Sequence, residues 1–164
     1  MWYSVRPFSL SASHMLHVIS HLDDPLLALV KDDPVRPEIE LAFRVSDTSH
    51  VFVLLEEQPD AVSPRPAAVV CCAYRSMVPA TVEELRLVPA TTPSTAVFYT
   101  IWSYSPGAGR RLIREARSWI ESHRQGVGQF VTLSPPTEMA RVFHIRNGAS
   151  VLRVNGDTVN YLYA

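Results

Sequence analysis

The segment 105–109, with the sequence SPGAG, contains residue types that could bind a ligand. It follows an apolar run and precedes a predicted helix that begins at about Arg110. A strand that opens into a Gly-x-Gly turn and a helix presents free backbone N–H groups and the positive end of a helix dipole, which together bind phosphate. Arg110 and Arg111 would add charge-assisted contacts. A plain turn and cap is the alternative, since the loop fits neither a Walker A motif nor a dinucleotide fingerprint.

Ser134 and His144 are a second pair of residues that could do chemistry. Ser134 precedes Pro135, which favours an extended backbone at a strand end and suits a hydroxyl directed into a cleft. His144 lies in a predicted helix end, and histidine is the side chain best able to exchange a proton near neutral pH. Both residues also have ordinary interpretations, because Ser-Pro often starts a loop and a histidine at a helix end often caps or packs.

Three histidines near the N-terminus, His14, His17 and His21, have the spacing of one helical face. His17 and His21 match the spacing of a two-histidine metal site. No glutamate lies between them in the zincin pattern, and no third ligand is evident. We therefore expect a partly exposed polar face and no metal site.

Hydrophobic spacing predicts the elements that position these residues. In the first segment four apolar residues recur at helical spacing: Met15, Val18, Leu22 and Leu26. We expect a helix from an N-cap at Ser11 to about Lys31, kinked at Pro25, with Asp32 and Asp33 as helix-end charges. Residues 38–45 alternate between apolar and polar types and predict a strand.

Three wholly apolar runs predict central strands that are covered on both faces: residues 51–55, 67–74 and 95–102. After the glycine loop we expect a helix over 110–123, a strand over 129–133 and a helix over 137–145. A hairpin of 150–154 and 158–163 closes the chain around an Asn-Gly turn. This order indicates an α/β (α+β) fold around a mixed sheet.

The composition is that of a globular protein with one domain. The chain has 164 residues, of which 47% are hydrophobic and 19% charged, and its formal net charge is −1. These values exclude intrinsic disorder and a global field that would hold a nucleic acid or an anionic membrane surface. No apolar run reaches the roughly 18 residues of a membrane span. The chain start lacks the pattern of a secretion signal, and the adjacent Cys71 and Cys72 indicate buried reduced thiols, so we expect a cytoplasmic protein.

The order of strand, Gly-x-Gly loop, helix, strand, helix ending in Asn-Gly, and hairpin resembles the acetyl-CoA-dependent N-acetyltransferase (GNAT) superfamily. This resemblance implies a mixed, mostly antiparallel sheet with helices on both faces and a coenzyme A pyrophosphate at the glycine loop. The segment 143–149, FHIRNGA, is similar to the end of the family's helix, where a tyrosine helps protonate the departing thiolate. This chain has His144 in that place.

A closer resemblance is to the catalytic domain of malonyl-CoA decarboxylases, and it covers about residues 51–164. Six blocks of the chain carry it in the same order: 96–101 (AVFYTI), 109–113, 130–135 (FVTLSP), 143–149, 153–155 and 159–163 (VNYLY). It implies that Ser134 hydrogen-bonds the malonyl carboxylate and that His144 orients it and supplies a proton to the enolate. The residues implied in coenzyme A binding are Tyr99, Ile101, Gly107, Ala108, Gly109, Arg110 and Arg111. Asn147 and Tyr161 are implied in the substrate pocket.

The leading expectation is therefore decarboxylation of malonyl-CoA or a related malonyl thioester. An acyl-CoA N-acyltransferase is a second hypothesis, and an inactive acyl-CoA-binding domain is a third. The thioester partner is coenzyme A or an acyl carrier protein, with no metal, and a homodimer is an open alternative. The first 50 residues form an N-terminal helical cap and a first strand that could cap the sheet, cover the acyl pocket or form a dimer.

Overall fold

The structure is a computed structural model that describes residues 13–164. Its elements, in chain order, are β1 (His14–Ile19), the 3₁₀ helix η1 (Pro25–Asp32), α1 (Leu41–Arg44), β2 (Ser49–Glu56), β3 (Arg65–Arg75), α2 (Val82–Leu85), β4 (Thr95–Ser103), α3 (Ala108–His123), β5 (Gln129–Thr132), α4 (Glu138–Arg146), β6 (Ala149–Val154) and β7 (Val159–Tyr163). The predicted N-cap at Ser11 and the chain start used to exclude a secretion signal lie outside the described residues.

All seven strands form one twisted sheet in the order β1-β2-β3-β4-β5-β7-β6. Every neighbouring pair is antiparallel except β4 and β5, which run parallel. The predicted mixed sheet, the three central strands, both helices of the second half and the closing hairpin are therefore confirmed. The predicted burial of both cysteines is also confirmed, and each is a free thiol in β3.

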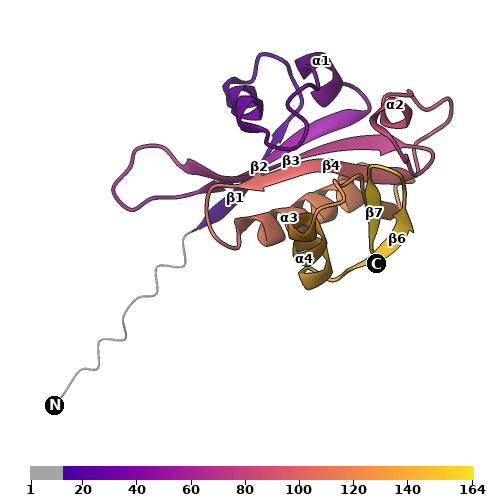
Figure 1. Cartoon of the computed structure of the whole chain (residues 1–164). Helices are drawn as coiled ribbons and strands as arrows, with labels where there is room; N and C mark the ends of the chain where they lie inside the picture. The colour runs from indigo at the N-terminus through magenta and orange to yellow at the C-terminus, as the bar shows by residue number, and fades with distance from the viewer. Residues whose placement is uncertain (1–12) are drawn as a thin grey trace.

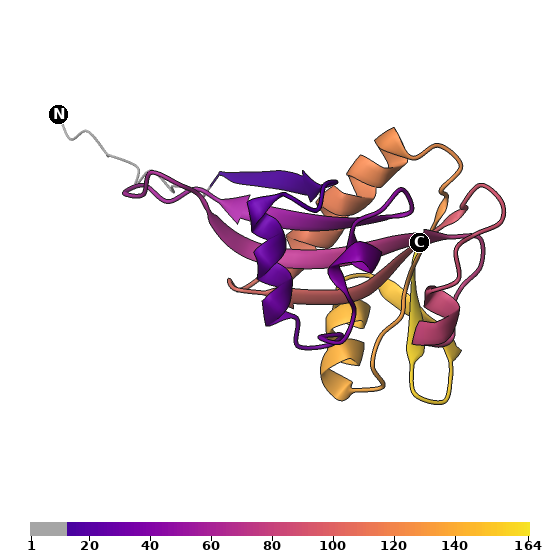
Figure 2. The same cartoon turned by 90° about the horizontal axis from the view of Figure 1, so that it is seen from above.

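Helices cover both faces of the sheet and create two hydrophobic cores (Figure 1). On one face α3 buries the apolar stripe of Leu112, Ala116 and Ile120 against β2, β3 and β4, as a helix with apolar residues at a spacing of 3.6 must do. The opposite face is covered by η1, α1 and α2. Seen from above, η1 lies across the central strands (Figure 2). The apolar central strands fit this arrangement because both of their faces are buried.

The predicted helix from Ser11 to Lys31 is wrong. Residues 14–19 pair with β2 over six positions as the edge strand β1, and only residues 25–32 are helical, in the 3₁₀ form. Pro25 begins η1 instead of kinking a longer helix, because proline fits the first position of a helix, and Asp24 caps it by accepting from the Leu26 N–H. The prediction that His14, His17 and His21 share one helical face is therefore also wrong, because His14 and His17 lie on the strand β1.

The predicted strand over residues 38–45 is also wrong. Ile39 and Val45 are buried, but Leu41 is half exposed and residues 41–44 form the short helix α1. The edge of β2 is already occupied by β1, so this segment has no strand edge to join there. Within residues 13–164, no helix is both long enough and apolar enough to cross a bilayer.

Candidate active site

The parallel strands β4 and β5 separate after four residues. Their pairing runs from Thr95 opposite Gln129 to Phe98 opposite Thr132. Beyond that point β4 continues to Ser103, whereas the chain after β5 turns away and Ser134 pairs with Val159 of β7. The separation opens the sheet between two of its central strands.

A β-bulge in β4 marks the point of separation. Cys71 and Cys72, adjacent on β3, pair with Thr100 and Phe98, so Tyr99 is an extra residue on β4. Bulges bend a strand and change the direction of the side chains that follow. The bulge therefore lies where β4 leaves β5.

The opening contains a cavity of about 250 Å³. It is bordered by the consecutive β4 residues 98–103, by Leu133, Ser134 and Pro135, by four residues of α4 with Thr137 before it, and by Val35. Because successive strand side chains alternate in direction, a border made of six consecutive residues includes the strand backbone. Beyond Phe98, whose C=O accepts from the Leu133 N–H, the N–H and C=O groups on the β5 side of β4 have no β5 partner and can hydrogen-bond a ligand.

Ser134 and His144, which lie ten residues apart, meet at the inner end of this cavity. The distance between Ser134 Oγ and His144 Nε2 is 3.1 Å, and both residues are 4% exposed. Ser134 is held at the end of the β5 segment by reciprocal backbone hydrogen bonds with Val159. His144 lies in the last turn of α4, a helix that Thr137 caps by accepting from the Ala140 N–H. The two residues implied in catalysis are therefore brought together.

Two further hydroxyls extend the pair into a hydrogen-bonded chain. Tyr163 lies 2.7 Å from His144 Nδ1, and Thr132 Oγ1 accepts from Ser134 at 2.8 Å and from the Tyr161 N–H at 3.1 Å. Since the single Ser134 proton is given to Thr132, His144 Nε2–H donates to Ser134 and Nδ1 accepts from Tyr163. The geometry thus assigns His144 the neutral tautomer with its proton on Nε2.

Burial keeps this chain neutral. Loss of solvent lowers the pKa of His144 from its ordinary 6.5 to about 4, and it raises the pKa of the Tyr163 phenol. The ring of Tyr161 stacks on His144 with 4.9 Å between centroids and 27° between planes. His144 is therefore fixed on its face by Tyr161 and at its Nδ1 edge by Tyr163.

The cavity continues into a groove at the glycine loop. Both are bordered by Ser103, Met139 and Phe143, and the groove extends to Gly107 and Arg110. A single cleft therefore connects the Ser134–His144 pair to the N-terminus of α3, where free N–H groups favour an anion.

The glycines of the loop have separate structural reasons. Gly107 has a φ of +77°, a left-handed conformation that glycine adopts without strain. Gly109 has no room for a side chain, because a Cβ would lie 2.8 Å from Ser103 Oγ and 3.2 Å from the Phe143 ring. The start of α3 thus approaches β4 and α4 as closely as the backbone allows.

The remaining predicted coenzyme A contacts are placed unevenly along the cleft. Ile101 borders the inner cavity, and Tyr99 borders it while its ring is buried among the core of the opposite face. Ala108 packs into the α3 core and donates its N–H to Ser105. Arg111 lies farther out and its Nε is 3.1 Å from Glu115.

The two residues predicted for the substrate pocket do not border the inner cavity. Asn147 borders the outer groove at the glycine loop. Tyr161 lies behind His144 and orients its ring. Neither position is a wall of the space next to Ser134.

Sequence reasoning missed Thr132, Tyr163 and Val35. Thr132 could have been found, because a residue two positions before Ser134 on a strand shares its face. Tyr163 belongs to the quoted VNYLY block but had no assigned role. Val35 comes from the N-terminal segment, and no local signal in the sequence connects it with the cleft.

The N-terminal histidines have other surroundings. His17 Nε2 lies 2.6 Å from Asp24 Oδ2, at the start of η1. Among residues 13–164 no group of three or more His, Cys, Asp or Glu side chains is arranged to hold a metal ion.

Comparisons with known proteins place this geometry among solved structures. No family model and no curated protein matches the chain. A malonyl-CoA decarboxylase from Agrobacterium vitis is 25% identical with a TM-score of 0.62, over 82% of this chain and 37% of its own. The enzyme from Rhodopseudomonas palustris is 20% identical with a TM-score of 0.69, over 92% and 56%. The chain thus spans about a third to a little over half of these two proteins.

A second group of similar structures matches over nearly their whole length. Arabidopsis thaliana NAA60 in complex with acetyl-CoA is 13% identical with a TM-score of 0.62, over 92% of this chain and 98% of its own. The chain has a GNAT-like fold, similar to that of malonyl-CoA decarboxylases and GNAT acetyltransferases.

Proposed function

We propose that this protein is an enzyme that binds an acyl-CoA thioester and decarboxylates a malonyl thioester to the acetyl thioester. The observation that carries the proposal is the hydrogen-bonded Ser134–His144 pair at the inner end of a cleft whose outer end is the glycine loop. Similarity to malonyl-CoA decarboxylases supports the reaction, and the acetyl-CoA complex of NAA60 supports coenzyme A as the ligand of such a fold.

The proposed substrate lies along the cleft from end to end. Its pyrophosphate binds the first N–H groups of α3 and the Arg110 side chain, which borders the outer groove. Its amide-bearing arm hydrogen-bonds the β4 backbone that β5 leaves unpaired. Its thioester and acyl group then lie between β4 and the Ser134–His144 pair.

Decarboxylation breaks the bond between the carboxylate carbon and the α-carbon. The electron pair moves into the thioester as an enolate, carbon dioxide leaves, and the α-carbon takes up one proton. In the proposed mechanism the Ser134 hydroxyl rotates from Thr132 to the malonyl carboxylate and holds it out of the thioester plane. Burial of this carboxylate removes water that would stabilise the anionic ground state, which favours loss of neutral carbon dioxide.

His144 supplies the proton in this proposal. It is neutral in the free site, with a pKa of about 4, but a carboxylate next to Nε2 favours the protonated ring and raises that pKa. The substrate anion and a proton therefore enter the site together. When the carboxylate leaves as carbon dioxide, the imidazolium loses its partner and gives its proton to the enolate carbon.

One observation favours a second candidate, an acyl-CoA N-acyltransferase. The chain covers 98% of NAA60 but only 37–56% of the two decarboxylases named above. In that function His144 would protonate the departing thiolate in place of the family's tyrosine, and an amine would take the acyl group.

Incubation of the purified protein with malonyl-CoA, followed by mass spectrometry, separates these functions. We expect acetyl-CoA to form, with kcat reduced about 10²–10⁴-fold in His144→Gln and about 10–100-fold in Ser134→Ala. His50→Gln removes another buried histidine, which borders neither the cavity nor the groove, and should retain activity. Malonyl-CoA that stays intact while calorimetry shows coenzyme A binding would contradict the decarboxylase. Acylation of added amines would then support the N-acyltransferase. If no amine were acylated, the result would support an inactive acyl-CoA-binding domain. Malonyl groups on an acyl carrier protein are tested in the same assay.

A further inference from the structure

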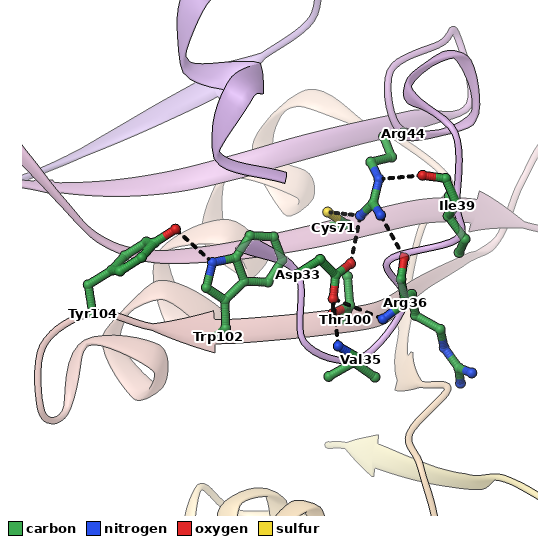
Figure 3. A network of polar contacts seen from close by, with 9 residues as sticks. All are labelled: Asp33, Val35, Arg36, Ile39, Arg44, Cys71, Thr100, Trp102 and Tyr104. Carbon is green, nitrogen blue, oxygen red and sulfur yellow. Dashed lines mark hydrogen bonds and ion pairs between the residues drawn. The ribbon is translucent and has the colours of Figure 1, made fainter. Parts of the chain in front are cut away.

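The turn that follows η1 is built around one buried carboxylate. Asp33 Oδ1 accepts from the backbone N–H groups of Val35 and Arg36 at 2.8 and 2.9 Å, and from Thr100 Oγ1 of β4 at 2.7 Å (Figure 3). Asp33 Oδ2 accepts from Arg44 Nη1 at 2.8 Å. Burial acts to raise the pKa of Asp33, but the hydrogen bonds from Arg36, Arg44 and Thr100 outweigh it and hold the pKa below its ordinary value.

Arg44 completes the same network from the other side. Its guanidinium donates to the Ile39 and Arg36 carbonyls at 3.0 and 2.7 Å, and it lies 3.4 Å from Cys71 Sγ of β3 (Figure 3). Four donor–acceptor contacts therefore occupy one buried side chain. This fixes the path of residues 33–44 over the sheet.

The turn, together with the last residue of η1, contacts β4 and the chain after β5, which border the cleft. On the β4 side, Tyr104 donates to Asp32 at 2.6 Å and accepts from Trp102 Nε1 at 3.0 Å, and Trp102 is a wall of the inner cavity. On the β5 side, Arg36 Nη2 donates to the Leu133 carbonyl at 3.2 Å, directly before Ser134. The turn thus bridges β4 and the chain after β5 at the point where they separate.

Val35 is carried by this turn to the border of the inner cavity. The cavity is bordered by α4, which carries His144, and by Val35, which follows η1; α4 and η1 lie on opposite faces of the sheet (Figure 1). Of the three roles open to the N-terminal segment, this placement favours covering the acyl pocket. An acceptor that approached the thioester from the η1 face would have to displace the turn.

We propose that the Asp33–Arg36 turn is the floor of the acyl pocket and that Val35 restricts the substrates to thioesters of short acyl groups, acetyl and malonyl among them. This inference rests on the proposed binding of an acyl-CoA, but it does not depend on the reaction. Each methylene that a hydrophobic pocket accepts or rejects changes affinity about tenfold or more, so a change in the size of residue 35 has a measurable effect.

The test is the affinity of wild type and Val35→Ala for coenzyme A, acetyl-CoA, butyryl-CoA and hexanoyl-CoA, measured by titration calorimetry. Wild type should bind acetyl-CoA more tightly than hexanoyl-CoA. Val35→Ala should improve hexanoyl-CoA binding about tenfold or more while free coenzyme A binds as before. Val35→Phe should weaken the binding of acetyl-CoA without affecting the binding of free coenzyme A. Val154 is exposed on β6, and Val154→Ala is the matched control. Thermal unfolding of each variant establishes that it is folded.

The outcomes separate this inference from the proposed function. Identical chain-length profiles in wild type and Val35→Ala would overturn the role of Val35, whatever the reaction. Selective binding of short thioesters, without release of carbon dioxide from malonyl-CoA, would contradict the proposed decarboxylation but support the proposed role of Val35. A wild-type protein that binds neither coenzyme A nor any of the thioesters would overturn both.

Discussion

Arg44 and Asp33 form an ion pair of 2.8 Å in which the two side chains are 1% and 0% exposed. They lie eleven positions apart in the chain, yet their contact determines how the N-terminal segment crosses the sheet. A buried charge pair of this kind contributes little compared with a well-packed apolar pair, but loss of one partner leaves a charge without compensation.

Arg44→Met should therefore be strongly destabilising. We expect the free energy of unfolding to fall by about 3–5 kcal/mol, because Asp33 remains buried without its cation. Chemical denaturation measures the change. Arg86→Met is the matched control, since Arg86 pairs with Glu40 at 2.7 Å on the surface, and it should unfold nearly as wild type. Equal stability of the two variants would show that the buried pair does not hold the turn.

Tyr163→Phe should impair the orientation of His144 and leave substrate binding intact. The variant loses the hydroxyl that donates to Nδ1, so the preference for the Nε2–H tautomer weakens. We expect kcat to fall about tenfold, the effect of one hydrogen bond of roughly 1–1.5 kcal/mol, with little change in KM. Nitrogen chemical shifts of His144 should show a mixture of tautomers.

A second tyrosine–histidine pair provides the control for this variant. Tyr74 lies 2.8 Å from His50 Nδ1, away from the cleft, and Tyr74→Phe should leave kcat unchanged. An unchanged kcat and tautomer in Tyr163→Phe would remove Tyr163 from the proposed mechanism.

Stability should depend on pH through two buried histidines. Burial lowers the pKa of His144 and of His50 from 6.5 to about 4. Between pH 6.5 and 4 the unfolded chain binds more protons than the folded one. The free energy of unfolding therefore falls as the pH falls through this range, and it has its full value above pH 6.5. Each histidine accounts for at most about 3 kcal/mol of this loss.

Denaturation curves at several pH values check this expectation. His144→Gln and His50→Gln should each flatten the dependence between pH 4 and 6.5 by a similar amount, but only His144→Gln should lose activity. If His144→Gln kept the wild-type slope, His144 would not be a neutral buried group in the folded protein.

Gly109→Ala should separate the start of α3 from its neighbours. The new methyl group would lie 2.8 Å from Ser103 Oγ and 3.2 Å from Phe143, both of which border the cleft. We expect a loss of about 1–3 kcal/mol of stability from overpacking and weaker coenzyme A binding. Gly128→Ala meets no atom within 4 Å and should bind coenzyme A as wild type does. Calorimetry that finds equal affinities for both variants would argue against a ligand at this loop.

The second half of the chain could be predicted from the sequence because its signals are local. The apolar stripe of α3, the apolar run of β4 and the turn after β6 each depend on neighbouring residues. The meeting of Ser134 and His144 followed from a resemblance, since spacing alone does not determine how α4 packs against the sheet.

Residues 13–45 could not be predicted in the same way. The apolar residues of β1 also fit a helical spacing, and pairing with β2 decided between the two. Asp33 was interpreted as a helix-end charge, because its partners Arg44 and Thr100 are 11 and 67 residues away. Long-range partners of this kind leave no pattern in a single sequence.

The extra residue in β4 changes the phase of the strand. Before it, Phe98 belongs to the core under α3 and Val97 to the opposite core; after it, Ile101 packs toward α3 and Trp102 toward the opposite core. Odd and even positions thus exchange sides at Tyr99. With an uninterrupted alternation, Thr100 would point toward α3 and could not reach Asp33. Deletion of Tyr99 would leave Phe98 and Thr100 as neighbours on opposite faces, as their pairing with the adjacent Cys72 and Cys71 already places them, so the outer half of β4 would keep its sides. The bulge thus accommodates one extra residue in β4 without turning Thr100 away from Asp33.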